Sequence, residues 1–183
     1  MRNHINSLVY YKLFLFHLKI EREYIMSKIY EIEDEEILYY VYNLNWLLPK
    51  ENQEIAIDFL TNLPTDKVDM ILPKYGKECW ENGVHVIKKM GYPKNKKALP
   101  KLARLLQDRN WPGSLEAIEI FRELGKEIAI PYIESECISA AKQQDIDWLE
   151  HLFFACNSLN YNEDDFEHKD VYRIMKKSAE SLY

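Results

Sequence analysis

Glycine is scarce in this sequence, and paired cysteines and long apolar runs are missing from it. The 5 glycines among 183 residues are too few for a loop-rich or β-rich protein and agree with a helical chain. The three cysteines, Cys79, Cys137 and Cys156, are odd in number, widely spaced and without a C-x-x-C pair. This pattern indicates reduced, packed thiols, and we therefore expect a cytoplasmic protein.

The short motifs that carry catalysis or hold cofactors are also missing. The sequence has no H-E-x-x-H, no G-x-S-x-G, no P-loop and no G-x-G-x-x-G. His85 and His151 are isolated histidines within expected helices, and such residues are more often structural than metal-ligating. We therefore expect no enzymatic activity, no catalytic residue, no metal and no cofactor.

Composition and charge narrow the class of protein further. An apolar content of 47% with 13% aromatic residues is enough to build a core, and 183 residues fit one domain. The formal net charge of −6 argues against a general nucleic-acid binder, which normally carries a basic face.

The most informative stretch is Leu99–Gly113, which reads L-P-K-L-A-R-L-L-Q-D-R-N-W-P-G. Pro100 suits the first turn of a helix, and the short polar side chains of Asp108 and Asn110 suit a turn or cap. Trp111 precedes a proline and so fits a helix boundary. The stretch therefore predicts the end of one short helix and the start of another. Their apolar positions are Leu102, Leu105, Leu106, Leu115, Ile118, Phe121 and Leu124, and Gly125 is the predicted stop.

Features of this stretch recur at a fixed distance. Ile130–Pro131 lies 31 positions after Leu99–Pro100, and Trp111 lies 31 positions after Trp80. A helix pair of that length is too short to bury its apolar face alone, so neighbouring pairs must share a core. The repeat predicts an all-α fold, an α-solenoid of short helical repeats of the HEAT or armadillo kind.

Several of these segments resemble a known family. Leu99–Gly113, Ile130–Pro131–Tyr132, Asp145–Trp148 and Leu48–Pro49–Lys50 are similar to the L-P … L-Q-D … N-W-P signature of a small bacterial HEAT-like domain family. The resemblance spans about Trp46–Leu159. It implies a HEAT-like fold and a binding role, including immunity functions beside bacterial toxin genes, and it brings no catalytic residues.

The first 25 residues differ from the rest of the chain. Leu8–Ile20 is apolar and aromatic, but it is too short and too charged for a membrane span. A signal peptide, an extra packed helix and an over-long start with Met26 as the true initiator are the open interpretations, and we favour the last. We therefore divide the chain into an extension, 1–25, and a single HEAT-like domain, 26–183.

Periodicity predicts the remaining helices. The expected ranges are 34–48, 52–63, 80–90, 131–144, 145–159 and 164–182. The helix at 145–159 is apolar nearly all round, so we expect it to be sandwiched between others.

Three groups of residues are candidates for partner binding. The segment from Lys88 to Arg104 carries seven cations and no acid, which indicates either a solvated surface or a site for an acidic partner. An acidic cluster before the first helix suits helix initiation or mimicry of an acidic ligand. Trp111 is either wedged between helices or contacts a ligand. The candidate residues are Asp108, Asn110, Trp111, Lys94, Lys96, Lys97, Glu35 and Glu36.

These observations lead to one leading hypothesis and two alternatives. The leading one is a non-catalytic helical domain that binds another protein and, more narrowly, an immunity protein that occludes a bacterial toxin, since an acidic protein suits blocking a basic nuclease. The enzymatic alternative is a HEAT-like DNA glycosylase, which needs a basic groove, base-stacking aromatics and a catalytic Asp. The third is a structural subunit. The sequence predicts no membrane partner and leaves the oligomeric state open.

Overall fold

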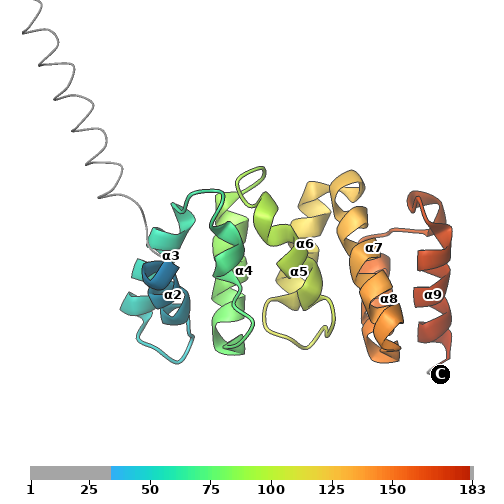
Figure 1. Cartoon of the computed structure of the whole chain (residues 1–183), viewed down its shortest axis with the longest axis horizontal. Coiled ribbons are helices and arrows are strands. Elements are labelled where there is room, and N and C mark those ends of the chain that lie inside the picture. Colours follow the sequence, from blue (N-terminus) through green and yellow to red (C-terminus); the bar gives the residue numbers. More distant parts are fainter. Residues whose placement is uncertain (1–33, 182–183) are drawn as a thin grey trace, which may run out of the picture. The chain divides into compact units, whose positions relative to one another are not determined.

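The computed structural model describes residues 34–181 of the chain (Figure 1). Two compact units are distinguished, Met1–Glu36 and Ile37–Tyr183, and the architecture below is that of the second. The expected boundary between residues 25 and 26, and the alternatives for residues 1–25, lie outside the described residues.

The described residues contain only helices, in agreement with the predicted all-α class. They form eight α-helices and four short 3-10 helices, with no strand between residues 34 and 181. The α-helices are α2 (Asp34–Asn43), α3 (Lys50–Thr61), α4 (Trp80–Met90), α5 (Leu99–Leu105), α6 (Ser114–Leu124), α7 (Lys126–Gln143), α8 (Ile146–Ser158) and α9 (Lys169–Glu180). The 3-10 helices are η1 (Val68–Ile71), η2 (Lys77–Cys79), η3 (Lys96–Ala98) and η4 (Glu163–Asp165).

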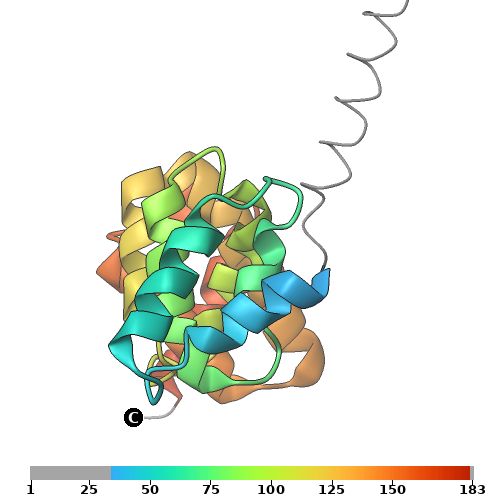
Figure 2. The same ribbon diagram turned by 90° about the vertical axis from the view of Figure 1, so that its left-hand side faces the viewer.

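Each helix of the second unit packs against helices that are close to it in the chain. The contacting pairs include α3 with α4, α4 with α6, α5 with α7, and α8 with both α7 and α9. In Figure 1, α4 to α9 follow one another across the view, and Figure 2 shows α3 crossing the end of the unit that faces the viewer. The contact of α8 with α7 and α9 confirms that this apolar helix is sandwiched.

A continuous apolar core runs beneath these helices. Its largest fully buried side chains include Trp148, Phe121, Leu102 and Ile133. Close packing at α4 depends on Gly83, because a Cβ there would lie 3.1 Å from the Ile71 carbonyl oxygen and 3.0 Å from a Leu72 methyl. The helix can therefore lie directly against the η1 segment.

The expected start of the helix at 131 is wrong. α7 begins at Lys126, directly after Gly125, and includes Pro131 in its interior. By contrast, Pro100 lies in the first turn of α5. The two Leu/Ile-Pro pairs repeat in sequence but occupy different helical positions, so the 31-residue spacing marks no equivalent helix start there.

Three other boundaries or faces also differ from expectation. α2 ends at Asn43 rather than at residue 48, because Asn45 turns the chain by accepting a 2.8 Å hydrogen bond from the Leu47 N–H. Leu115 is 54% exposed, since the buried face of α6 is formed instead by Ala117, Ile118 and their neighbours. α9 begins at Lys169 rather than at residue 164, because η4 and a loop precede it.

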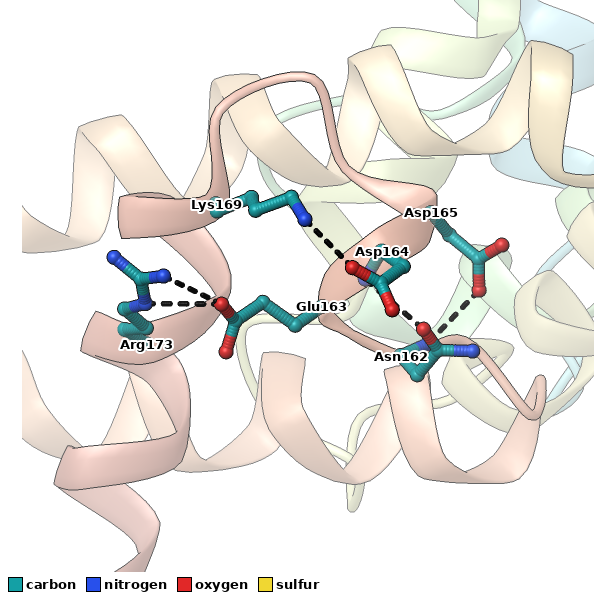
Figure 3. A network of polar contacts seen from close by, with 6 residues as sticks. All are labelled: Asn162, Glu163, Asp164, Asp165, Lys169 and Arg173. Carbon is teal, nitrogen blue, oxygen red and sulfur yellow. Dashed lines mark hydrogen bonds and ion pairs between the residues drawn. The ribbon is translucent and has the colours of Figure 1, made fainter.

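The turn between α8 and α9 is held by a polar network (Figure 3), which we call the 162–173 network. Asn162 and Asp165 form a capping box, in which the Asp164 N–H donates to Asn162 Oδ1 at 2.9 Å and the Asn162 N–H donates to Asp165 Oδ2 at 3.0 Å. Arg173 donates two hydrogen bonds to Glu163 Oε1, and Lys169 donates one to Asp164. The network fixes the start of α9 relative to the turn before it.

Between residues 34 and 181, no helix combines the length and the apolar character that crossing a membrane demands.

Candidate functional site

The loop that joins α5 to α6 is shaped by the residues of the Q-D-R-N-W-P-G stretch. Asp108 turns the chain: its Oδ1 accepts from the Asn110 N–H at 2.8 Å and its carbonyl accepts from the Trp111 N–H at 2.9 Å. Gly113 has a φ of 83°, and a Cβ there would lie 2.7 Å from Val84 Cγ2. Only glycine allows the loop to lie this close to α4, which brings Trp111 to Trp80.

The two tryptophans form the centre of the candidate site. Their ring centroids are 5.3 Å apart with an interplanar angle of 58°. Trp80 is 7% exposed, and its Nε1–H donates to the Pro73 carbonyl at 2.9 Å. Trp111 is half-buried: its ring packs against Trp80 and also borders open space, and its contact with a ligand stays a prediction.

That open space is a cavity of about 390 Å³, which we call the aromatic–basic pocket. It lies between the segment after η1, the start of α4, helix α5 and the α5–α6 loop. Its lining residues are Leu72, Pro73, Lys74, Trp80, Lys101, Arg104, Leu105, Gln107 and Trp111. The volume falls within the range of small binding sites, and the floor is apolar while the rim is cationic.

Lys77 adds a further positive charge beside the pocket. Its Nζ lies 4.1 Å from the centroid of the Trp111 ring and 5.5 Å from that of Trp80. This is a cation–π arrangement, which holds an ammonium over an aromatic face without neutralising it. Across the described chain, no carboxylate forms an ion pair with Lys77 or Lys74.

The other two cations of the pocket are fixed by the walls. Lys101 Nζ donates to the Leu72 carbonyl at 2.9 Å, and burial lowers the pKa of Lys101 while Asp69 acts in the opposite direction. Arg104 Nε lies 2.6 Å from Glu136 Oε2, and the guanidinium is 4.6 Å from the Trp148 ring. Burial raises the pKa of Glu136, although Arg104 partly offsets this effect.

The three predicted lysines lie elsewhere. Lys94, Lys96 and Lys97 line a separate hollow of about 520 Å³ together with Tyr132. Lys97 Nζ donates to the Asp66 carbonyl at 3.3 Å. Only the Lys101–Arg104 end of the predicted basic segment therefore reaches the aromatic–basic pocket.

The remaining predicted residues are also placed by the structure. Asp108 is half-buried, and its Oδ1 lies 3.7 Å from His151 Nε2, while Asn110 is exposed. Glu35 and Glu36 are exposed in the first turn of α2, where carboxylates favour the helix dipole. They belong to the first compact unit, and Trp111 is thus the one predicted residue that lines the pocket.

Sequence reasoning missed most of the pocket. Lys74, Lys77 and Gln107 are outside every predicted group, although Lys77 precedes Trp80 by three positions, and Lys101 is predicted only as part of the Lys88–Arg104 basic segment. The signal that pointed here was the 31-residue spacing of Trp80 and Trp111, which the fold converts into a direct ring contact.

Within residues 34–181, no group of three or more His, Cys, Asp or Glu side chains is arranged to hold a metal ion. The three cysteines are free and buried, as expected, and burial raises the pKa of Cys79 to about 11. Comparison of the chain with protein-family models, curated proteins and solved structures gives no significant match.

Proposed function

We propose that this chain is a non-catalytic helical-repeat domain that binds another protein through the aromatic–basic pocket. The observation that carries the proposal is the half-buried Trp111, whose ring packs at a tilt beside Trp80 at the edge of a cavity of about 390 Å³. Partly exposed tryptophans in a pocket are characteristic anchors of protein interfaces, because a large rigid ring can bury apolar area at a small entropic cost.

The helix packing supports a repeat architecture for this domain. α4 packs against α6, α5 packs against α7 and α7 packs against α9, so three of the helices contact the one two places further along the chain. This is the pattern of helix pairs that stack in an α-solenoid of HEAT-like repeats. The buried, free thiols agree with a reducing compartment, and the proposed location is the cytoplasm.

The narrower proposal is an immunity protein that occludes a bacterial toxin. A net charge of −6 accelerates encounter with a basic protein such as a nuclease, and the pocket then provides specific contacts at short range.

The proposal is tested by affinity capture of the partner protein from the native cell, with the wild-type chain and its variants compared as baits. The wild-type chain is compared with Trp111→Ala and with Tyr39→Ala, a matched control at an aromatic residue that is 63% exposed on α2. We expect one stoichiometric protein with the wild type and the control, and its loss with Trp111→Ala. Lys77→Glu, which changes an exposed side chain, repeats the test without removing a packed ring.

Purified components then decide the narrower role. If the captured protein is toxic when expressed alone, co-expression of the wild-type chain is expected to restore growth, and co-expression of Trp111→Ala is not. Equal capture by all variants would overturn the pocket as the binding site. Recovery of the chain alone and monodisperse would overturn protein binding, and a non-toxic partner in a larger stable assembly would favour a structural subunit.

The DNA glycosylase alternative has one observation in its favour. The aromatic–basic pocket combines two tryptophans with cations, as a base-binding groove would. However, Lys77 Nζ lies 4.1 Å from the centroid of the Trp111 ring, so it occupies one of the two ring faces available for stacking a base. Duplex binding measured at low and moderate salt distinguishes the two functions, since salt-sensitive affinity with release of a base would support the enzyme.

A further inference from the structure

The side chains that line the pocket are held in position by contacts within the chain. Trp80 is tied to Pro73, Lys101 is tied to Leu72, and Arg104 is tied to Glu136 on a third element. These contacts hold the aromatic floor and the cationic rim in place before a partner arrives. Preorganisation of this kind improves affinity because few side chains lose freedom on binding.

The rim carries positive charge with unused hydrogen-bonding capacity. An ammonium has three N–H donors, and the Lys101 ammonium uses one of them on Leu72. Lys77 and Lys74 are placed against aromatic rings rather than carboxylates, with Lys74 Nζ 5.1 Å from the centroid of Tyr75. No acidic residue is among those that line the pocket in the described part of the chain.

Such a rim selects the charge of the occupant. A partner lysine or arginine would be repelled by the surrounding cations, whereas a carboxylate would accept hydrogen bonds from several of them. A carboxylate alone fills only part of a cavity of about 390 Å³, and the floor of Leu72, Leu105 and Trp111 is apolar. An apolar side chain next to the carboxylate would occupy that remaining space.

We propose that the aromatic–basic pocket binds an acidic side chain of the partner protein together with a neighbouring apolar or aromatic side chain. This inference rests on the proposed function and specifies the chemistry of the partner. The carboxylate lies between Lys77 and Lys101, and the apolar side chain lies against Leu72, Leu105 and Trp111. Lys77 stays over the Trp111 ring and presents its ammonium to the carboxylate.

The charge of the whole chain makes this anchor selective. Because the net charge is −6, a strongly acidic partner is repelled at long range, whereas the cations of the pocket attract a carboxylate at short range. The partner that fits is therefore basic overall and exposes one acidic–apolar segment. The net negative charge of the chain acts at long range and raises the encounter rate. The cations of the pocket act at short range and lengthen the lifetime of the complex.

Selection of random peptides displayed on phage tests the inference. The wild-type chain is the target, and Lys77→Glu is used for counter-selection. We expect enrichment of peptides in which Asp or Glu lies beside Phe, Leu, Ile or Trp. Synthetic amidated versions are expected to lose about tenfold in affinity when the target carries Lys101→Gln, and to bind normally when it carries Lys96→Gln.

The possible outcomes distinguish failure of the acidic anchor from failure of the proposed function. Pocket-dependent peptides that are neutral or basic would overturn the acidic anchor but leave protein binding intact. Affinity unchanged by Lys77→Glu and Lys101→Gln would also overturn it. Displacement of the peptides by a fluorescent DNA duplex, with strong salt dependence, would replace it with a nucleic-acid site. If neither peptides nor a cellular partner bind, the proposed function fails together with the inference.

Discussion

The aromatic–basic pocket and the 162–173 network contain the same kinds of charged side chain, used in opposite ways. In the network, both cations have a carboxylate partner: Arg173 binds Glu163 and Lys169 binds Asp164 (Figure 3). Beside the network, Lys126 of α7 binds Asp165 at 2.7 Å. In the pocket, Lys77 and Lys74 contact aromatic rings and Lys101 contacts a carbonyl, while Arg104 is the lining cation that has a carboxylate partner, Glu136.

The difference indicates which region stabilises the fold and which is available for binding. Charges that are paired within the chain have little left to offer a partner, and they order a turn at the end of the second unit. Charges held by aromatic rings and carbonyls keep their net field, so they remain able to attract an anion. The predictions below test this contrast, beginning with the core that supports both regions.

Phe121→Ala should have the largest effect. Phe121 is 0% exposed, and its loss leaves a cavity in the core, so we expect destabilisation of about 3–5 kcal/mol by chemical denaturation. Leu115→Ala on the same helix is the control, because Leu115 is 54% exposed and should change the stability by less than about 0.5 kcal/mol. Equal effects of the two would contradict the observed face of α6.

Arg104→Ala should have the second-largest effect and lower the free energy of unfolding by about 2–3 kcal/mol at neutral pH. The change leaves the buried Glu136 carboxylate without its cation, since the Glu136 side chain is 8% exposed. Arg104 is 47% exposed and can be solvated, so Glu136→Gln should cost less, about 1 kcal/mol. Calorimetry of both variants provides the comparison.

The pH dependence of the destabilisation caused by Arg104→Ala tests whether the unpaired Glu136 carboxylate is its cause. Burial raises the pKa of Glu136 and Arg104 lowers it, so without Arg104 the folded-state pKa rises further above the unfolded one. The folded state then binds the proton more tightly, and the penalty should shrink as the pH falls and return as the pH rises through the folded pKa. A penalty independent of pH would show that lost packing on Trp148 dominates.

Asn162→Ala should have a moderate effect. It removes one half of the capping box in the 162–173 network, and we expect a loss of about 1 kcal/mol in the free energy of unfolding. Asn157→Ala, at an exposed position on α8, is the matched control and should be close to neutral. If the two variants unfold at the same denaturant concentration, the network does not stabilise the turn.

Acidification should also weaken the network. Donation from Lys126 and from the Asn162 N–H lowers the pKa of Asp165. A depressed carboxyl pKa contributes stability above the unfolded pKa, and that contribution is lost as the pH falls through the folded pKa. Asp165→Asn should therefore flatten the acid side of the stability profile, measured by denaturation at several pH values. A profile unchanged by Asp165→Asn would contradict this assignment.

The smallest effect is expected for Lys96→Glu combined with Lys97→Glu. Both side chains are exposed on η3, and the change should leave the thermal midpoint nearly unchanged. In the peptide assay the double variant should bind like the wild type, because these lysines line a different hollow. Unfolding of the domain would show that the hollow is structural, and loss of peptide binding would extend the site beyond the aromatic–basic pocket.

The sequence determined the helical class and most of the helix positions. Apolar periodicity located α4 at its observed bounds, Trp80–Met90, and Gly125 marked the end of α6. The Asp108 turn and the first-turn position of Pro100 were also predictable, because capping and proline geometry act within a few residues. Local interactions of this kind are encoded in neighbouring positions.

Only the tertiary structure decided which of these residues form a site. The helix start at Lys126 and the exposure of Leu115 depend on packing against other helices, which periodicity alone does not specify. The pocket depends on Gly113 allowing the α5–α6 loop to approach α4, and on Lys77 of η2 lying near the side of the pocket formed by Lys101 and Arg104 of α5. Which cations have a carboxylate partner and which do not is known only from the fold, because the distance between two residues in the sequence does not indicate which carboxylate a lysine contacts.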